Sequence, residues 1–235
     1  MDYWVLKQLN HLMASSIFLS KQANLFNNIG VLELIMASLL VGWWFSKESQ
    51  ASRSFNIRHR TLLVFLAFLP TYGLIRVLQS IFHRPRPLIN VPLQVPSLFQ
   101  HEWNEVRTNS LSHLGSFPSD HAALFFLIST VAFTIDKRLG IISFLLSLYY
   151  GVLRVAIGYH WPSDILGGAI LGCLVALTIL SIEPLLKKVL DYLVLQVESH
   201  SAIAYTVSFL FLSDFGENFK YLKLIASGLG HRLFH

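Results

Sequence analysis

The chain is poor in charged side chains and carries a single cysteine. Of its 235 residues, 54% are hydrophobic and 13% are charged, whereas soluble domains carry about a quarter charged residues. This shortage argues against an ordinary soluble domain and favours a protein of the lipid bilayer; a soluble all-α protein with buried helices is the alternative. The lone Cys173 lies inside an apolar run, so it predicts a small packing residue and offers no disulfide framework.

Two further absences narrow the interpretation. Residues 1–28 lack the features of a secretory signal peptide, because Asp2 precedes Lys7 and no small-residue cleavage site follows. No basic stripe follows a polar helix, so we predict no nucleic-acid partner and assign the positive excess to Lys and Arg beside the membrane. The N-terminal apolar residues recur at helical spacing and predict an amphipathic helix in the membrane interface. They are Val5, Leu6, Leu9, Leu12 and Met13.

Long apolar runs predict membrane-spanning helices. Five stand out, at residues 29–45, 61–82, 122–135, 139–157 and 165–182. A spanning helix needs roughly 20 apolar residues, with a range of about 17 to 25. Only the run at 122–135 is too short, and residues 117–121 can complete it. We therefore predict an all-α integral membrane bundle of about six helices, with five spans and the N-terminal amphipathic helix.

Loop charges predict the orientation and the domains. The connector 46–60 carries four Lys or Arg residues against one Glu, which makes it cytoplasmic by the positive-inside rule. Counting spans from there, segments 83–117 and 158–163 lie outside. We predict a multi-pass protein of the inner (plasma) membrane with its site facing the outside or periplasm. Residues 1–183 form the membrane domain, and residues 184–235 form a cytoplasmic tail of amphipathic helices.

The external segment 83–117 holds four prolines, at positions 85, 87, 92 and 96, so it cannot be one regular helix. It is apolar in part, which predicts a loop lying in the headgroup region. Such a loop either borders the entry path of a substrate or is an interfacial loop without substrate contact.

Three short segments at the edges of the apolar runs carry the chemistry. They are Gln79 to Pro87 with Arg86, the tetrapeptide Pro118-Ser119-Asp120-His121, and Leu153 to Asp164 with Arg154 and His160. Phosphoryl transfer needs neutralised charge, an in-line nucleophile and a proton donor for the leaving oxygen. The two arginines offer forked donors that match a phosphate. The carboxylate of Asp164 can orient His160 and free its other ring nitrogen for attack.

The tetrapeptide is expected to open a helix, with Ser116 as the N-cap and Pro118 in the first turn. A helix start presents free N–H groups and a positive dipole end, which together bind anions. His121 lies at that start. No metal is expected, because Arg86 and Arg154 would repel a cation, and no cofactor is predicted.

The three segments closely resemble the signatures of the type-2 phosphatidic-acid phosphatase superfamily, which read K-x6-R-P, P-S-G-H and S-R-x5-H-x3-D; the resemblance covers Gln79 to about Gly172. It implies a six-helix membrane phosphatase that acts without a metal on a lipid phosphate or diphosphate. The implied roles are His160 as the nucleophile that forms a phosphohistidine, Asp164 as its orienting group, His121 as the general acid, and Arg86, Arg154, Ser119 and Gln79 as the phosphate-binding set. The N-terminal segment and the middle motif look similar to bacterial undecaprenyl-diphosphate phosphatases. Undecaprenyl diphosphate and the surrounding membrane lipids are therefore the expected partners.

Three positions depart from the family pattern. They are Asp120 in place of Gly, Leu153 in place of Ser and Gln79 in place of Lys. The change at Gln79 removes a full positive charge, so we expect reduced activity and, in Gln79→Lys, equal or higher activity. Arg84 and His83 are expected to replace the missing cation better than Arg76, because helical side chains lean toward the N-terminus.

Other readings of the same residues stay open. A phosphotransferase would pass the phosphate from His160 to another lipid or glycan, and a degenerate family member would only bind lipid phosphate. Vanadate-dependent haloperoxidases share related motifs but are remote from an apolar membrane chain. The small residues Gly168 and Gly172 permit close helix contact, within the bundle or in a dimer, so the oligomeric state is open.

Overall fold

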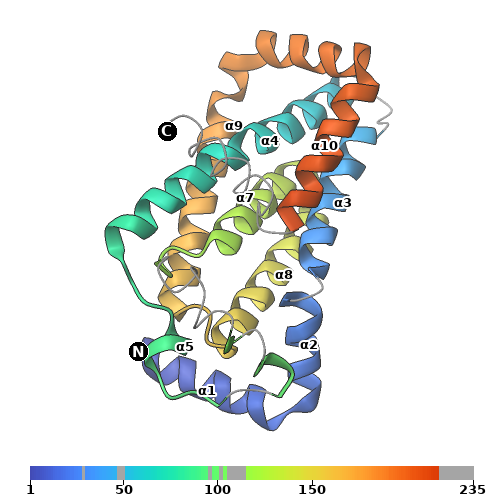
Figure 1. Ribbon diagram of the computed structural model, residues 1–235. Helices are drawn as coiled ribbons and strands as arrows, with labels where there is room; N and C mark the ends of the chain where they lie inside the picture. The colour runs from blue at the N-terminus through green and yellow to red at the C-terminus, as the bar shows by residue number, and fades with distance from the viewer. Residues whose placement is uncertain (28–29, 47–50, 95–96, 101–102, 105–114, 217–235) are drawn as a thin grey trace, which may run out of the picture.

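The computed structural model is a bundle of helices (Figure 1). It describes residues 1–27, 30–46, 51–94, 97–100, 103–104 and 115–216. Those residues contain no strand, so the prediction of an all-α fold is confirmed. The elements are α1 (Asp2–Ser15), α2 (Ile17–Asn27), α3 (Val31–Phe45), α4 (Ala51–Phe82), α5 (Pro87–Asn90), the 3-10 turn η1 (Ser97–Phe99), α7 (Asp120–Ile135), α8 (Lys137–Ala156), α9 (Pro162–Ser199) and α10 (Ser201–Gly216).

The apolar helices make this a multi-pass membrane protein. Among the described residues, three helical segments are long and apolar enough to cross a bilayer. They are helix α8, helix α9 and the segment Asn56–Asn90, which includes most of α4. The bent pair α2 and α3 gives a fourth if it is one span. The apolar helix α7 has 16 residues and is shorter than a span. The predicted count of five spans therefore stays a prediction for α7.

Helix α7 is the centre of the bundle. It packs against α8, α9 and α4, and every residue from Asp120 to Ser129 is buried. Two glycines of α9 allow the closest approach: a Cβ on Gly168 would lie 2.4 Å from the carbonyl oxygen of Ser119, and one on Gly172 would lie 2.1 Å from that of Ala123. The predicted packing role of this pair is confirmed. It holds the start of α9 against the start of α7, where two of the motifs lie.

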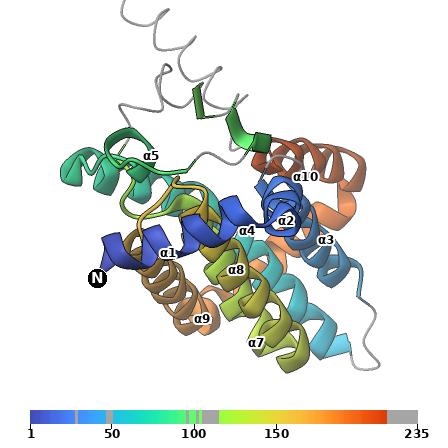
Figure 2. The same ribbon diagram turned by 90° about the horizontal axis from the view of Figure 1, so that it is seen from below.

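The N-terminal segment crosses one end of the bundle. Helix α1 lies over the ends of α8 and α9 (Figure 2). It buries Leu6 and Met13 and exposes Leu12, as an amphipathic helix does. The side-chain amide of Asn10 fastens it by donating to the carbonyl oxygen of Ala156 at 3.0 Å. The segment is two helices instead of one, because Ser16 is extended and separates α1 from α2.

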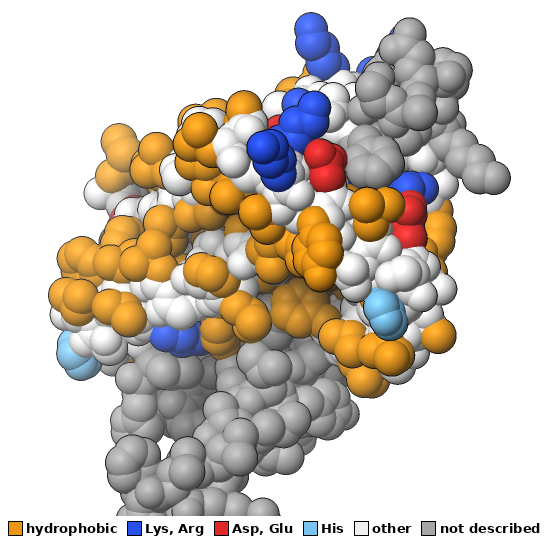
Figure 3. Space-filling view, turned by 90° about the horizontal axis from the view of Figure 1, so that it is seen from above, with side chains coloured by type: hydrophobic (Ala, Val, Ile, Leu, Met, Phe, Trp, Pro, Cys, Tyr) orange, Lys and Arg blue, Asp and Glu red, His pale blue; other side chains and the backbone are white. Residues whose placement is uncertain are grey.

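The opposite end of the bundle carries basic side chains (Figure 3). There Arg58 pairs with Glu198, and Arg60 Nε lies 3.1 Å from Glu183 Oε2. These arginines belong to the connector predicted to be cytoplasmic. The start of α4 therefore lies at the end of the bundle opposite to the end covered by α1 (Figure 1).

The C-terminal part folds back on the bundle. Helix α9 continues through Pro184 to Ser199, and α10 runs beside α3 (Figure 1). The hydroxyl of Tyr205 accepts from Trp44 Nε1 at 3.3 Å, and the Phe211 ring lies 5.7 Å from that of Phe68. The domain division at residue 183 and the cytoplasmic location of the tail stay predictions. Residues 217–235 of that tail lie outside the described residues.

The proline-rich segment after α4 is irregular where the structure describes it. It forms α5 and η1 and buries Phe99 and Trp103. Residues 95–96, 101–102 and 105–114 lie outside the described residues. The prediction that this segment lies in the headgroup region therefore stays a prediction.

Candidate active site

The three motif segments meet at the end of the bundle that α1 covers. Gln79 Nε2 donates to the carbonyl oxygen of Pro118 at 3.0 Å, which joins the end of α4 to the segment before α7. The Ser119 N–H donates to the carbonyl oxygen of Asp164 at 3.0 Å, which joins that segment to the start of α9. Residues that are far apart in the sequence are thus fixed beside each other by backbone groups.

His160 is fully buried between α8 and α9. Its Nδ1 lies 3.0 Å from the carbonyl oxygen of Ser116 and 3.6 Å from Asp164 Oδ2. Because both oxygens accept, we assign the proton to Nδ1 and the lone pair to Nε2. That Nε2 is buried without a hydrogen-bond partner among the described residues. Burial lowers the pKa of His160 to about 4; Asp164 opposes the shift, and Arg86 and Arg154 add to it. The neutral imidazole therefore predominates at neutral pH.

The carboxylate of Asp164 is fixed on both oxygens. Oδ2 accepts from the Trp161 N–H at 2.8 Å and closes the capping box of α9. Oδ1 accepts from Arg84 Nη1 at 2.8 Å, while Arg84 Nη2 lies 2.8 Å from Asp2 Oδ2. Two carboxylates thus engage Arg84, and His83 is exposed. The prediction that these two residues replace the missing phosphate-binding cation finds no support in this geometry.

Arg86 and Arg154 flank Tyr159, the residue before His160. Arg86 Nη1 donates to the Tyr159 carbonyl oxygen at 3.1 Å. The Arg154 guanidinium lies 4.8 Å from the centroid of the Tyr159 ring. Arg154 also donates a hydrogen bond to the side chain of Asn27. Their exposed fractions are 6% and 9%. In the part of the chain that the structure describes, neither forms an ion pair with a carboxylate, and the Nε of each lacks a partner. A buried guanidinium without a paired carboxylate is costly, so this pair is a candidate anion site.

Arg76 reaches further toward the motifs than the sequence predicts. Its Nη1 donates to Gln79 Oε1 at 2.6 Å, and its Nη2 donates to Tyr72 OH at 2.6 Å and lies 3.0 Å from Asp120 Oδ2. The expectation that Arg76 points away from the site is therefore wrong, because its long side chain follows α4 toward an acidic partner. The carboxylate of Asp120 neutralises it, so two departures from the family pattern, at positions 79 and 120, contact the same guanidinium.

This contact reverses the expectation for Gln79→Lys. An ammonium at position 79 removes the oxygen that accepts from Arg76 and places a second cation beside it. We expect the variant to be about 1–3 kcal/mol less stable and less active than wild type. The variant Arg76→Gln/Gln79→Lys, which keeps one cation, should recover both properties. Thermal unfolding in detergent and phosphate release measure the two effects, and a more active single variant would contradict the prediction.

His121 lies in the first turn of α7, as predicted, although the helix begins later than predicted. The N-cap is Ser119, whose Oγ accepts from the Ala122 N–H at 3.4 Å. Ser116 is not the cap, because its carbonyl oxygen faces His160 instead. The His121 Nδ1 lies 2.9 Å from Asp120 Oδ1. Asp120, which pairs with Arg76 through its other oxygen, therefore also orients the His121 ring.

Other site residues come from the joint between α2 and α3 and from α8. Asn27 contacts Arg154, and Glu33 lies 3.5 Å from His121 Nε2 and accepts from the Tyr150 hydroxyl. None of these three residues belongs to a motif that the sequence predicts. One signal was available for Glu33, since an ionisable residue inside an apolar run marks a functional site by default.

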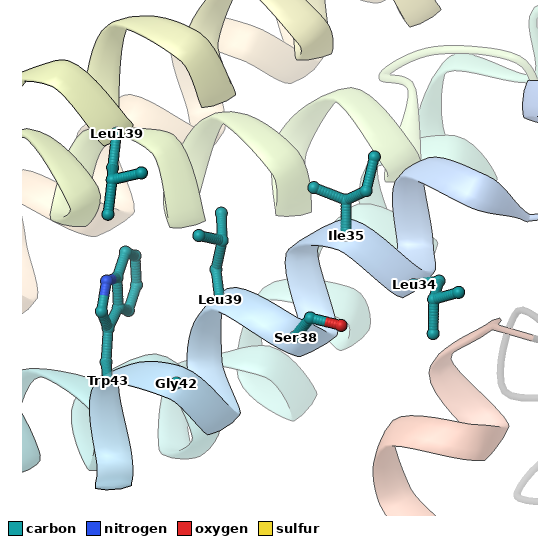
Figure 4. Close-up of a pocket in the computed structure, with 7 residues that line it drawn as sticks. All are labelled: Leu34, Ile35, Ser38, Leu39, Gly42, Trp43 and Leu139. Atoms are coloured by element: carbon teal, nitrogen blue, oxygen red, sulfur yellow. The ribbon is translucent and has the colours of Figure 1, made fainter. Parts of the chain in front are cut away.

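Two further features bear on ligands. Among the described residues, no group of three or more His, Cys, Asp or Glu side chains is placed to hold a metal ion. A groove of ≈ 530 Å³ runs along α3 and is lined by Leu34, Ile35, Ser38, Leu39, Gly42, Trp43 and Leu139 (Figure 4). None of the predicted site residues lines it.

The converging motifs agree with comparisons to known proteins. The model of the PAP2 superfamily matches residues 59–187, more than half of the chain. This chain belongs to the PAP2 superfamily. The family resemblance inferred from the three motifs is thereby confirmed. Membership of this family supports phosphatase activity on lipid phosphates as a class.

Among relatives, the bacitracin transport permease protein BcrC of Bacillus licheniformis is 29% identical over 150 residues. The alignment covers 63% of this chain and 64% of that relative, so it spans just under two thirds of the length of the relative. No solved structure matches the chain.

Proposed function

We propose that this PAP2 protein is a metal-independent membrane phosphatase that hydrolyses a lipid phosphate or diphosphate through a phosphohistidine on His160. One observation carries the proposal. The buried guanidinium groups of Arg86 and Arg154, which have no carboxylate ion pair among the described residues, lie beside the residue that precedes His160, whose Nε2 has no partner. A phosphate supplies the missing anion and the electrophile together. The two guanidinium groups offer the positive charge that a metal ion would otherwise provide.

The proposed reaction has two steps. His160 Nε2 attacks the phosphorus atom, the bond to the leaving oxygen breaks, and His121 donates a proton to that oxygen. Water then attacks the phosphohistidine, gives a proton back to His121 and releases inorganic phosphate as the nitrogen–phosphorus bond breaks. Asp164 lies beside Nδ1 of His160 and stabilises the positive charge of the phosphorylated ring. Arg86 and Arg154 hold the phosphate oxygens throughout.

Undecaprenyl diphosphate is the substrate we propose within this class. Support comes from the resemblance of the N-terminal segment and the Phe117 to His121 motif to bacterial undecaprenyl-diphosphate phosphatases. The relative with BcrC in its name is bacterial as well. The loop charges favour a site on the outer face of the inner membrane. The N-terminal helix α1, which exposes Tyr3 and Trp4 at this end of the bundle, provides interfacial anchors.

A substrate panel tests the proposal. We expect the purified protein, in detergent with a metal chelator, to release inorganic phosphate from undecaprenyl diphosphate, phosphatidic acid and phosphatidylglycerol phosphate, with the highest kcat/KM on the first. Metal-independent catalysis predicts that the chelator does not change the rate. A protein that is inert on all three lipids would contradict the proposal. Labelled phosphate that collects on a second lipid or glycan, instead of in solution, would identify a phosphotransferase.

A further inference from the structure

Glu33 is a buried carboxylate beside the general acid of the proposed reaction. It belongs to the first turn of α3 and is 4% exposed. Its Oε1 lies 3.5 Å from His121 Nε2 and accepts from the Tyr150 hydroxyl at 3.1 Å. Its Oε2 is buried without a hydrogen-bond partner among the described residues. No sequence motif of the site includes it.

The His121 ring is held from both sides. Asp120 Oδ1 lies 2.9 Å from Nδ1, and Glu33 Oε1 lies 3.5 Å from Nε2. The ring also packs 5.6 Å from Tyr150 and 5.8 Å from Phe125, measured between centroids. Each ring nitrogen therefore faces a carboxylate oxygen, and both oxygens attract the imidazolium, the form that carries a proton on each nitrogen. That is the form in which a histidine acts as an acid.

The partners of Glu33 fit a functional role better than a purely structural one. An acid in the first turn interacts favourably with the helix dipole, and at this position it can close a capping box onto Gly30. The capping bond is absent, since Gly30 has no side-chain cap and Glu33 Oε2 has no partner. A buried carboxylate that serves only structure is expected to satisfy both oxygens. In Glu33 only Oε1 has partners: it accepts from the hydroxyl of Tyr150 and lies beside His121 Nε2.

We propose that Glu33 is a positioning residue that holds the protonated His121 with Nε2 toward the leaving oxygen, an inference that rests on the proposed phosphatase function. At 3.5 Å the Glu33 oxygen is near enough to attract the imidazolium and too far for a tight hydrogen bond. A leaving oxygen can therefore take the Nε2 proton. When water attacks the phosphohistidine, its proton returns to Nε2 of the His121 ring, and the ring again has Asp120 beside Nδ1 and Glu33 beside Nε2.

The dependence on the leaving group tests this role. Loss of an acid slows departure of a poor leaving group more than departure of a good one. We expect Glu33→Gln to lower kcat by about 10- to 100-fold on phosphatidic acid, which loses an alkoxide. The loss should be smaller on a lipid diphosphate, whose leaving group is the lipid monophosphate. It should be smallest on p-nitrophenyl phosphate, whose leaving group is p-nitrophenolate. His121→Asn should show the same order with larger losses, and the double variant should be no slower than His121→Asn alone.

Controls separate this role from a fold defect. Glu183→Gln makes the same change at the opposite end of the bundle, where Glu183 pairs with Arg60, and should leave all three rates unchanged. Tyr150→Phe removes the hydroxyl that donates to Glu33 and should show a weaker form of the same order. If Glu33→Gln does not fold, Glu33→Asp keeps the charge and should give the graded loss.

Two outcomes overturn different statements. Equal losses on the three substrates, or no loss, in a folded Glu33 variant would show that Glu33 does not act through His121. Failure of the wild-type protein to hydrolyse any lipid phosphate would instead contradict the proposed function itself. The wild-type rates are measured in the same series, so the two failures are distinguishable.

Discussion

Replacing His160 with alanine is expected to lower phosphate release by roughly 10⁴-fold or more, because the variant lacks the nucleophile. In the proposed reaction the buried Nε2 of His160 is the reactive nitrogen, and the low pKa of the ring, about 4, keeps it neutral at pH 7. Wild-type protein that is quenched during turnover with labelled substrate should carry an alkali-stable, acid-labile phosphoryl group. His160→Ala should carry none.

A buried histidine at the far end of the bundle provides the control. His59 Nε2 lies 2.9 Å from Asp191 Oδ1, and its side chain is buried like that of His160. We expect His59→Ala to retain wild-type activity per folded molecule, with folding measured by thermal unfolding in detergent. Unchanged phosphate release in a folded His160→Ala would exclude the covalent route and favour a family member that only binds lipid phosphate.

The sequence predicted the parts of the site that depend on local pattern. The spacing from Leu153 to Asp164 determines how the chain turns from α8 into α9, so it correctly placed His160 near Asp164, with 3.6 Å between His160 Nδ1 and Asp164 Oδ2. Apolar runs likewise predicted the helices, since each run is a local property of the chain. The loop charges predicted that the motifs gather at one end, and in the structure they do.

Contacts between elements that are distant in the sequence could not be predicted in this way. The path of the Arg76 side chain depends on Asp120, a residue 44 positions later. The same holds for Glu33, whose partner Tyr150 is 117 positions away. Local rules were also overridden in α9, which continues through Pro184. Proline weakens a helix by removing one hydrogen bond, yet it does not end this one.

The arrangement of arginines fits the proposed anion site, which lacks the family lysine. Arg76 and Arg84 are each paired with carboxylates, Asp120 for the first and Asp164 for the second. They fix the groups that orient His121 and flank His160, and their charges are neutralised there. In the proposed site the phosphate is left to Arg86 and Arg154, so we expect each of these two to carry a larger share of the binding.

Replacing Arg86 with lysine is therefore expected to lower kcat/KM by about 10²- to 10³-fold although the charge is kept. Arg86 is buried, donates from Nη1 to the Tyr159 carbonyl oxygen and has a free Nε. A guanidinium can hold that oxygen with one nitrogen and a phosphate with another, whereas an ammonium is a single point.

Steady-state kinetics on a lipid diphosphate measure the effect, with Arg60→Lys at the opposite end of the bundle as the matched control. Arg60 donates to Glu183 and to the Thr134 carbonyl oxygen at the opposite end of the bundle. Its variant should keep the wild-type kcat/KM. If Arg86→Lys lost no more than about threefold, positive charge alone would suffice at this position. The proposal that Arg86 holds the Tyr159 carbonyl oxygen and the phosphate at the same time would then be wrong. The site would instead attract its substrate by positive charge without a directed hydrogen bond from this residue.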